Sequence, residues 1–201
     1  MESSPTHIEA RRLWRPGEVV FLLGPGGVGK STLGRELARQ LGWPLVDLDL
    51  EFCDRLAIIG EFITAHGYER YRAANLALAQ DLLASAIGPM IFVTASGFLA
   101  AQPETQDYHQ ARQLVATGYG LTLLPSLDLD VAAPIVVQRQ LGRGFGLIRD
   151  TEDRKFRDRF ALYQGEGDAL VVSTDAPANI ASAVIEATGM GVAAVSRGSL
   201  G

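Results

Sequence analysis

The chain has 201 residues, an apolar fraction of 47% and a formal net charge of −5 at pH 7. This length suits one well-packed domain, and the acidic balance argues against nucleic acid as a direct partner, because a phosphate backbone calls for a basic surface. The single cysteine, Cys53, excludes an intramolecular disulfide and a cysteine-rich metal site, which fits a reducing cytoplasm.

The first 17 residues are polar and lack the apolar core of a secretory signal. We interpret them as an N-terminal extension that is either solvated or loosely packed ahead of the first strand. No run of about 18 apolar residues follows, so no membrane span is expected. Residues 18–188 are predicted to form the domain, and residues 189–201, which have little periodicity, to form a flexible tail.

Residues 24–31 read Gly-Pro-Gly-Gly-Val-Gly-Lys-Ser, a complete G-x-x-x-x-G-K-[ST] phosphate-binding loop between an apolar run and a helical segment. Backbone N–H groups of such a loop point at phosphate oxygens, and the helix N-terminus favours negative charge. The alternative, a glycine-rich turn, leaves the lysine and the hydroxyl unexplained. We expect ATP or GTP, with Mg²⁺, to bind Gly24, Gly26, Gly27, Val28, Gly29, Lys30, Ser31 and Thr32.

Short apolar runs alternate with amphipathic stretches along the chain, a pattern typical of a parallel sheet covered by helices on both faces. The pattern predicts a three-layer α/β/α domain with a five-stranded parallel sheet. The strands are expected at residues 18–23, 44–48, 90–94, 121–124 and 169–173, and the helices at about 31–41, 50–66, 68–87, 104–117, 151–163 and 177–188.

Two stretches interrupt this rhythm. Residues 50–87 form a helical insertion, which we expect to bind the acceptor. Residues 125–150 contain Arg139, Arg143 and Arg149 among several glycines, which favours a lid whose arginines meet phosphate charge. An irregular surface loop with solvated arginines is the alternative.

The second predicted strand ends in Leu45-Val46-Asp47-Leu48-Asp49. Alternation along a strand places Asp47 and Asp49 on one side of its end, next to the phosphate-binding loop. A carboxylate there can coordinate Mg²⁺ or take a hydroxyl proton. The competing interpretation of Asp49 is a cap on the next helix.

These motifs resemble those of shikimate kinases, small P-loop kinases of the nucleoside-monophosphate-kinase-like group, over roughly residues 18–188. The resemblance implies the P-loop kinase fold and ATP-dependent phosphorylation of shikimate in aromatic amino acid biosynthesis. It implies that Ser31 and Asp47 organise Mg²⁺, and that Lys30, Asp49 and the lid residue Arg139 are catalytic, with Arg143 or Arg149 as alternatives to Arg139.

Two arginines match the carboxylate-binding positions of that family. The stretch from Ile59 to Arg72 is similar to G-x-x-I-x-x-I-F-x-x-x-G-E-x-x-F-R, and Arg159 to Tyr163 matches R-x-x-x-Y. The resemblance implies that Arg72 and Arg159 bind the substrate carboxylate together, and that Asp49 and Gly97 bind the substrate as well. Guanidinium groups suit a planar carboxylate, although a solvated helix-face charge is the alternative for each.

The sequence departs from the family around the acceptor. The family has Gly-Gly-Gly after the third strand, where this chain reads Thr94-Ala95-Ser96-Gly97-Phe98, so only Gly97 is retained. Asn75 takes the place of a glutamate that steadies the clamp. The proline after the lid arginine is replaced by Gln140, and the arginine that stacks on adenine has no counterpart near residues 131–137.

Three functions fit these residues. The first is a kinase for a small hydroxylated carboxylate, with shikimate as the leading candidate. The second is a ligand-sensing module without turnover, because shikimate-kinase-like domains also occur in transcriptional regulators. The third is a P-loop kinase for another hydroxyl, such as that of a nucleoside, sugar or antibiotic. We expect a monomer or a weak homo-oligomer, with a small molecule as the principal partner.

Overall fold

The computed structural model describes residues 6–142 and 147–191. Its core is one six-stranded sheet with the order β1-β6-β5-β2-β4-β3. The strands are β1 (His7–Ala10), β2 (Val20–Leu23), β3 (Leu45–Asp47), β4 (Ile91–Val93), β5 (Tyr119–Leu124) and β6 (Ala169–Val172). The five strands predicted from the apolar runs are all present, and they pair with one another in parallel.

The sixth strand corrects the prediction of a purely parallel five-stranded sheet. Strand β1 comes from the N-terminal extension and pairs antiparallel with β6, with His7 opposite Val172. Farther along this segment, Trp14 is buried against the core and Arg12 donates to Asp168 at 2.7 Å. A four-residue edge strand carries too little apolar alternation to stand out in a sequence, so only its long-range pairing identifies it.

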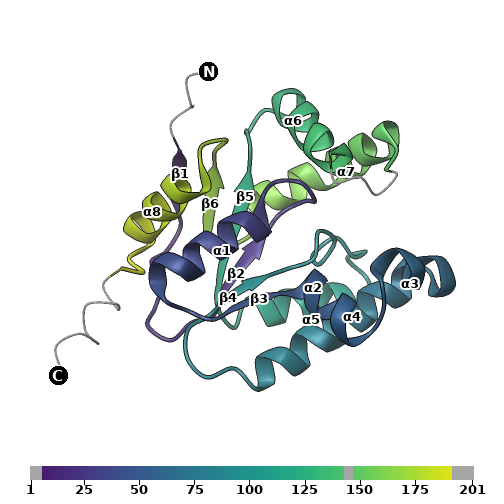
Figure 1. Cartoon of the computed structure of the whole chain (residues 1–201), viewed down its shortest axis with the longest axis horizontal. Helices are drawn as coiled ribbons and strands as arrows, with labels where there is room; N and C mark the ends of the chain where they lie inside the picture. Colours follow the sequence, from purple (N-terminus) through teal and green to yellow (C-terminus); the bar gives the residue numbers. More distant parts are fainter. Residues whose placement is uncertain (1–5, 143–146, 192–201) are drawn as a thin grey trace.

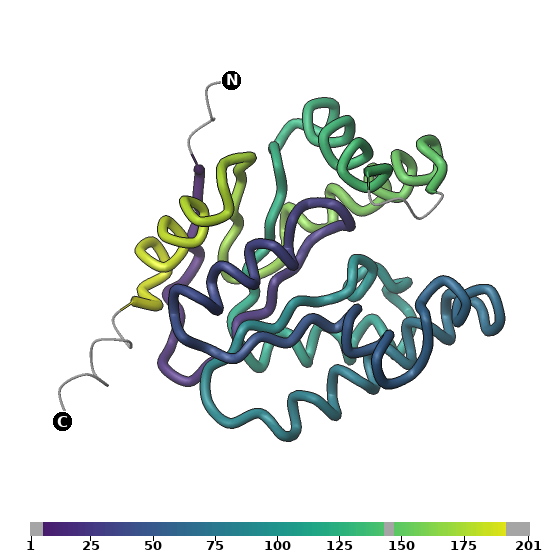
Figure 2. Tube along the Cα trace, in the orientation of Figure 1, coloured from purple at the N-terminus to yellow at the C-terminus, as the bar shows by residue number. Residues whose placement is uncertain are grey.

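Helices cover both faces of the sheet, which confirms the three-layer α/β/α architecture (Figure 1). Helices α1 and α8 lie side by side on one face, as the chain trace also shows (Figure 2). The helices are α1 (Lys30–Leu41), α2 (Leu48–Arg55), α3 (Ile59–His66), α4 (Tyr68–Ala84), α5 (Gln106–Val115), α6 (Leu129–Leu141), α7 (Arg149–Gly165) and α8 (Pro177–Thr188).

The insertion at 50–87 contains three helices, because the single helix expected over 50–66 is broken into α2 and α3. The break lets Phe62 pack edge-on against Phe52 with ring centroids 5.2 Å apart. In one continuous helix these residues would lie about 15 Å apart along the axis. Ring packing within the insertion therefore favours the turn over a longer helix.

Half of the stretch predicted as a lid is helix α6, a helix that was not predicted. Asp128 caps its N-terminus by accepting hydrogen bonds from the backbone N–H groups of Asp130 and Val131. Pro134 lies inside the helix, and an internal proline normally argues against one. The lid itself stays a prediction, and Arg143 lies outside the described residues.

Among the described residues, no helix has the length and apolar character needed to cross a membrane. Cys53, in α2, is exposed. Residues 192–201 of the predicted tail lie outside the described part of the chain.

Candidate functional site

The phosphate-binding loop connects the central strand β2 to helix α1, at the carboxyl edge of the sheet where α/β proteins bind ligands. Gly24, Gly27 and Gly29 have φ values of +138°, +81° and +107°, which residues with a side chain rarely adopt. Lys30 begins the helix and is buried, and its Nζ donates to the carbonyls of Gly24 at 2.7 Å and Pro25 at 3.0 Å. The lysine therefore folds back over the loop.

A small cavity of about 70 Å³, the loop cavity, lies inside this turn. The predicted phosphate ligands Gly26, Gly27, Gly29, Lys30 and Ser31 line it, together with Asp49, Thr94, Ser96 and Gln140. Five of the eight nucleotide residues predicted from the motif thus surround one space. Ser31 contributes a hydroxyl to that space, a ligand type that Mg²⁺ accepts.

On the other side of the loop lies a second cavity of about 320 Å³, the edge cavity. It is lined by Gly27, Val28, Gly29, Thr32, Leu33, Leu123, Arg139, Ser173, Thr174, Asp175, Pro177 and Ile180. Val28 and Thr32, predicted with the phosphate ligands, thus lie here. The cavity adjoins the loop glycines, so it is placed to hold the rest of a nucleotide whose phosphates lie in the loop cavity.

The two described arginines of the predicted lid, Arg139 and Arg149, line different cavities. Arg139, on α6, lines the edge cavity and donates to the carbonyl of Val28 at 3.4 Å. Arg149 begins α7 and lines a different hollow with Pro134 and Asp153. Of the two described arginines, Arg139 is therefore the one beside the phosphate-binding loop.

The two aspartates at the end of β3 have different environments. Asp47 caps α2, since its carboxylate accepts from the backbone N–H of Asp49 at 3.2 Å. Asp49 itself lies in the first turn of α2, so strand alternation does not place the pair as expected. The capping role considered for Asp49 belongs to Asp47, and Asp49 borders both the loop cavity and the cavity described next.

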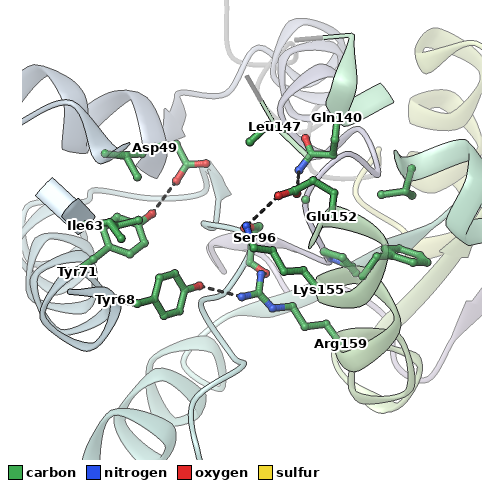
Figure 3. Close-up of a pocket in the computed structure, with 15 residues that line it drawn as sticks. Asp49, Ile63, Tyr68, Tyr71, Ser96, Gln140, Leu147, Glu152, Lys155 and Arg159 are labelled. Carbon is green, nitrogen blue, oxygen red and sulfur yellow. Dashed lines mark hydrogen bonds and ion pairs between the residues drawn. The ribbon is translucent and has the colours of Figure 1, made fainter. Parts of the chain in front are cut away.

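The central cavity, of about 220 Å³, lies between the insertion helices and helices α6 and α7 (Figure 3). It shares Gly26, Asp49, Ser96 and Gln140 with the loop cavity, so a molecule in it would lie next to the phosphates. Its other lining residues are Pro25, Ile59, Ile63, Tyr68, Tyr71, Val136, Leu147, Glu152, Lys155, Phe156 and Arg159.

Asp49 is held on the insertion side of the central cavity by Tyr71. The Tyr71 hydroxyl donates to Asp49 Oδ1 at 3.3 Å and accepts from Asn75 Nδ2 at 3.3 Å. Burial, with the negative charge of Asp49 as the next cause, raises the pKa of Tyr71 above its ordinary value. The phenol therefore stays protonated at neutral pH and acts as a donor to the carboxylate.

Arg159 reaches the cavity from α7. Its Nη2 donates to the Tyr68 hydroxyl at 2.9 Å, and its Nη1 donates to the Ser96 carbonyl at 3.4 Å. Tyr163 donates to the same carbonyl at 3.2 Å. The R-x-x-x-Y spacing thus fastens one turn of α7 to the loop after β4 and directs the guanidinium toward the cavity (Figure 3).

Arg72 is not brought into the central cavity. It lines a rear cavity of about 10 Å³ with Asn75 and Gly97, although its guanidinium carbon lies 5.8 Å from the Tyr68 ring centroid. Arg72 Nε and Asn75 Oδ1 are buried without hydrogen-bond partners among the described residues. Arg72 and Arg159 therefore do not face one cavity together, as expected of two arginines that bind the same carboxylate. The Tyr68 ring lies beside both guanidinium groups.

Sequence reasoning missed five residues that line the central cavity: Tyr68, Tyr71, Gln140, Glu152 and Lys155. Three of them carried a signal. On the alignment of the stretch ending in Arg72, Tyr68 and Tyr71 stand at the glutamate and phenylalanine of G-E-x-x-F-R, and Gln140 stands at the lid proline. Glu152 and Lys155 carried none, because an i, i+3 charge pair is the usual pattern of a solvated helix face.

Gly97→Ala should weaken binding in the central cavity. A Cβ there would overlap the Tyr68 hydroxyl and lie 3.4 Å from Arg159 Nη2, so the Tyr68–Arg159 hydrogen bond must shift. We expect the dissociation constant of a carboxylate ligand to rise about tenfold, with nucleotide affinity unchanged, both measured by calorimetry. Gly60→Ala is the matched control, since a Cβ added at this position would have no atom within 4 Å. Unchanged ligand affinity in Gly97→Ala would show that this contact does not shape the site.

The shikimate kinase family model matches residues 26–188 of the chain. A shikimate kinase of Aeromonas salmonicida is 30% identical over 177 residues, which cover 85% of this chain and 96% of that protein. One from Rhodopseudomonas palustris is 29% identical over 165 residues, covering 79% of this chain and 74% of that protein.

Solved structures show the same fold. A shikimate kinase of Acinetobacter baumannii in complex with shikimate superposes with a TM-score of 0.71 at 20% identity, covering 87% of this chain and 94% of that one. A gluconokinase of Sinorhizobium meliloti gives a TM-score of 0.59 at 19% identity, covering 94% of this chain and 99% of that one. At such identities these structures support the architecture only.

Proposed function

Because the chain belongs to the shikimate kinase family and is a small-molecule kinase that uses ATP, we propose that it phosphorylates a hydroxyl of shikimate with MgATP. The observation that carries this proposal is the central cavity. Asp49 stands where this cavity meets the loop cavity, and Arg159 also lines it. A hydroxylated carboxylate can place its hydroxyl at Asp49 and its carboxylate at Arg159.

The nucleotide is assigned to the two cavities along the phosphate-binding loop. Its β- and γ-phosphates would lie in the loop cavity against the backbone N–H groups of the loop and Lys30, and the nucleoside in the edge cavity beside Arg139. The Ser31 hydroxyl would hold Mg²⁺, whose charge neutralises the phosphates. Asp47 can join that shell only by giving up or sharing its cap on α2.

Transfer needs a proton acceptor beside the attacking hydroxyl. The acceptor oxygen forms a bond to the γ-phosphorus, the bond between that phosphorus and the bridging oxygen breaks, and ADP leaves. The hydroxyl proton passes to Asp49, which borders both cavities. Lys30, and Arg139 if it moves inward from its contact with Val28, would stabilise charge on the transferring group.

A coupled assay of ADP release with MgATP, with and without millimolar shikimate, tests the proposal. We expect ADP release that depends on shikimate, and a phosphorylated product detectable by ³¹P nuclear magnetic resonance. Nucleotide binding without shikimate-dependent turnover would overturn shikimate as the acceptor.

A second candidate acceptor is another hydroxylated carboxylate. The observations that favour it are Ser96 in the central cavity, where the family has glycine, and Arg72 in the rear cavity. Gluconate, an open-chain polyhydroxylated carboxylate, is a suitable first alternative in the same assay. Turnover with gluconate and silence with shikimate would select this candidate.

Tyr71→Phe should change the pH dependence of turnover. Tyr71 is a positioning residue, because its protonated hydroxyl stabilises the ionised form of Asp49. Removing that donor should move the acid limb of the kcat/KM profile to higher pH by about one unit, since one unit corresponds to about 1.4 kcal/mol, the scale of such a hydrogen bond. The family motif has phenylalanine here, so we expect the variant to fold.

Tyr108→Phe, on α5, is the control for this variant, because its ring stacks on Arg112 away from the site. Its pH profile should match that of the unmodified protein. An unshifted acid limb in Tyr71→Phe would show that the tyrosine does not act on Asp49.

A further inference from the structure

The central cavity has a polar group on its α6–α7 side that the proposed function does not use. The Glu152 side chain is only 8% exposed, and its Oε1 accepts from Lys155 Nζ at 2.8 Å. Its Oε2 accepts from Gln140 Nε2 across a longer 3.5 Å contact. Figure 3 shows the carboxylate between the ends of these two side chains. A buried glutamate is costly unless it is paired, so this group is an organised feature and not a solvated helix face.

This group retains capacity to accept hydrogen bonds. A carboxylate offers about four lone-pair positions, and the two contacts above use two of them. Gln140 Oε1 is buried and has no hydrogen-bond partner within the described residues. A buried acceptor without a donor costs about 1–3 kcal/mol, so a ligand that supplies a donor is favoured here.

The hydrogen-bonding groups of the cavity differ from one side to the other. Arg159 donates, and the Tyr68 hydroxyl, which already accepts from Arg159, has its own proton left to donate. Opposite, Asp49, Glu152 and Gln140 Oε1 supply acceptors, with the Lys155 ammonium as a donor beside Glu152. The donor side suits a carboxylate. The acceptor side suits groups that donate, at Asp49 and at a second place beside Glu152.

We propose that Gln140, Glu152 and Lys155 form a subsite that binds a second hydroxyl of the acceptor, one that is not phosphorylated. This inference rests on the proposed function and extends it, because it makes the enzyme selective for polyhydroxylated carboxylates. A neutral hydroxyl is preferred over an ammonium group, because Lys155 already balances the charge of Glu152. The hydroxyl donates to Glu152 or Gln140 Oε1.

The position of Gln140 links this subsite to the phosphate-binding loop. Its amide packs so closely on Gly26 that a Cβ there would lie 2.5 Å from Nε2. The same side chain lines both the central and the loop cavities. An acceptor hydroxyl bound to Gln140 would thereby fix the shikimate ring relative to the phosphate-binding loop. Such positioning promotes phosphoryl transfer.

The test is a cycle that combines protein variants with altered ligands. Shikimate and analogues that each lack one ring hydroxyl are assayed with the unmodified protein and with Glu152→Met. We expect loss of one particular hydroxyl to raise KM about 10- to 100-fold in the unmodified protein, and Glu152→Met, which removes the acceptor oxygens, to raise KM for shikimate by a similar factor. The two changes together should raise KM little further, because both remove one contact.

Two further variants keep the result interpretable. Asp153, the next residue on α7, pairs with Arg157 on the outer surface. The variant Asp153→Asn should therefore leave every KM unchanged. Gln140→Met keeps the packing on Gly26 and removes Oε1, so it tests the subsite if Glu152→Met does not fold.

The outcomes separate the hydroxyl subsite from the proposed shikimate kinase activity. Shikimate turnover with fully additive effects would overturn the subsite and leave the proposed function standing. An analogue with ammonium in place of the selected hydroxyl that bound better than shikimate would overturn the preference for a neutral group. Absence of shikimate turnover in the unmodified protein would overturn the proposed function, and the subsite with it.

Discussion

Lys30→Ala is expected to reduce turnover by about 1000-fold or more while the protein remains folded. Lys30 is a buried cation where the phosphate-binding loop meets α1, and its Nζ lies 2.7 Å from the Gly24 carbonyl. When phosphates enter the loop cavity, this ammonium can exchange carbonyl contacts for phosphate oxygens. A donor that meets developing charge in a site shielded from water contributes about 10²–10³ in rate, and loss of nucleotide affinity adds to that.

The measurement is steady-state ADP release, together with a thermal unfolding curve for each variant. Lys30→Met retains the buried aliphatic stem and should lose activity equally, which separates the charge from the packing. Arg39→Ala, on the exposed side of the same helix and paired with Glu36, should retain full activity. Activity of Lys30→Ala near that of the unmodified protein would overturn the assignment of the loop.

The parts of the site that could be predicted from the sequence are those encoded by short motifs. Residues 24–31 form the turn that the motif specifies, because three of its glycines adopt positive φ angles and the helix starts at Lys30. Asp49 was predicted from the Asp-x-Asp pattern and borders both cavities, although it lies in the first turn of α2 and not on the strand. For such elements, neighbouring residues along the chain largely determine the geometry.

The remainder depends on which helices pack together. Glu152 and Gln140 meet because α6 packs on α7, and no spacing within either helix reveals that contact. Tyr68 similarly receives a hydrogen bond from Arg159, a residue 91 positions away. Strand β1 is a further example, since its pairing with β6 joins the two ends of the domain. Long-range contacts of this kind carry no local signal.

Arg72 shows the limit of transferring a motif by spacing. The alignment puts it at a carboxylate-binding position, yet Tyr68 stands where the motif has glutamate and lies beside both arginines. The Tyr68 hydroxyl accepts the hydrogen bond from Arg159 that a ligand carboxylate would otherwise receive. A ligand carboxylate must therefore bind alongside the Tyr68 hydroxyl or displace it. This requirement comes from Tyr68, and the identity of residue 72 does not reveal it.

Asp49→Asn is expected to reduce phosphoryl transfer by about 10²–10⁴-fold and to change nucleotide affinity by less than about threefold. Asparagine has nearly the same shape and can still accept the hydrogen bond from Tyr71, so the local structure should persist. It cannot take up the proton of the attacking hydroxyl, and general-base catalysis contributes a factor of this size.

Single-turnover phosphoryl transfer and calorimetric nucleotide binding, measured on the same preparation, separate the two effects. Asp54→Asn, an exposed position on the same helix, is the matched control and should behave as the unmodified protein. Equal losses of transfer and nucleotide affinity would move Asp49 to a role in holding Mg²⁺ or in maintaining the fold. Loss of transfer alone would place the proton acceptor at the border of the central and loop cavities, where Asp49 lines both.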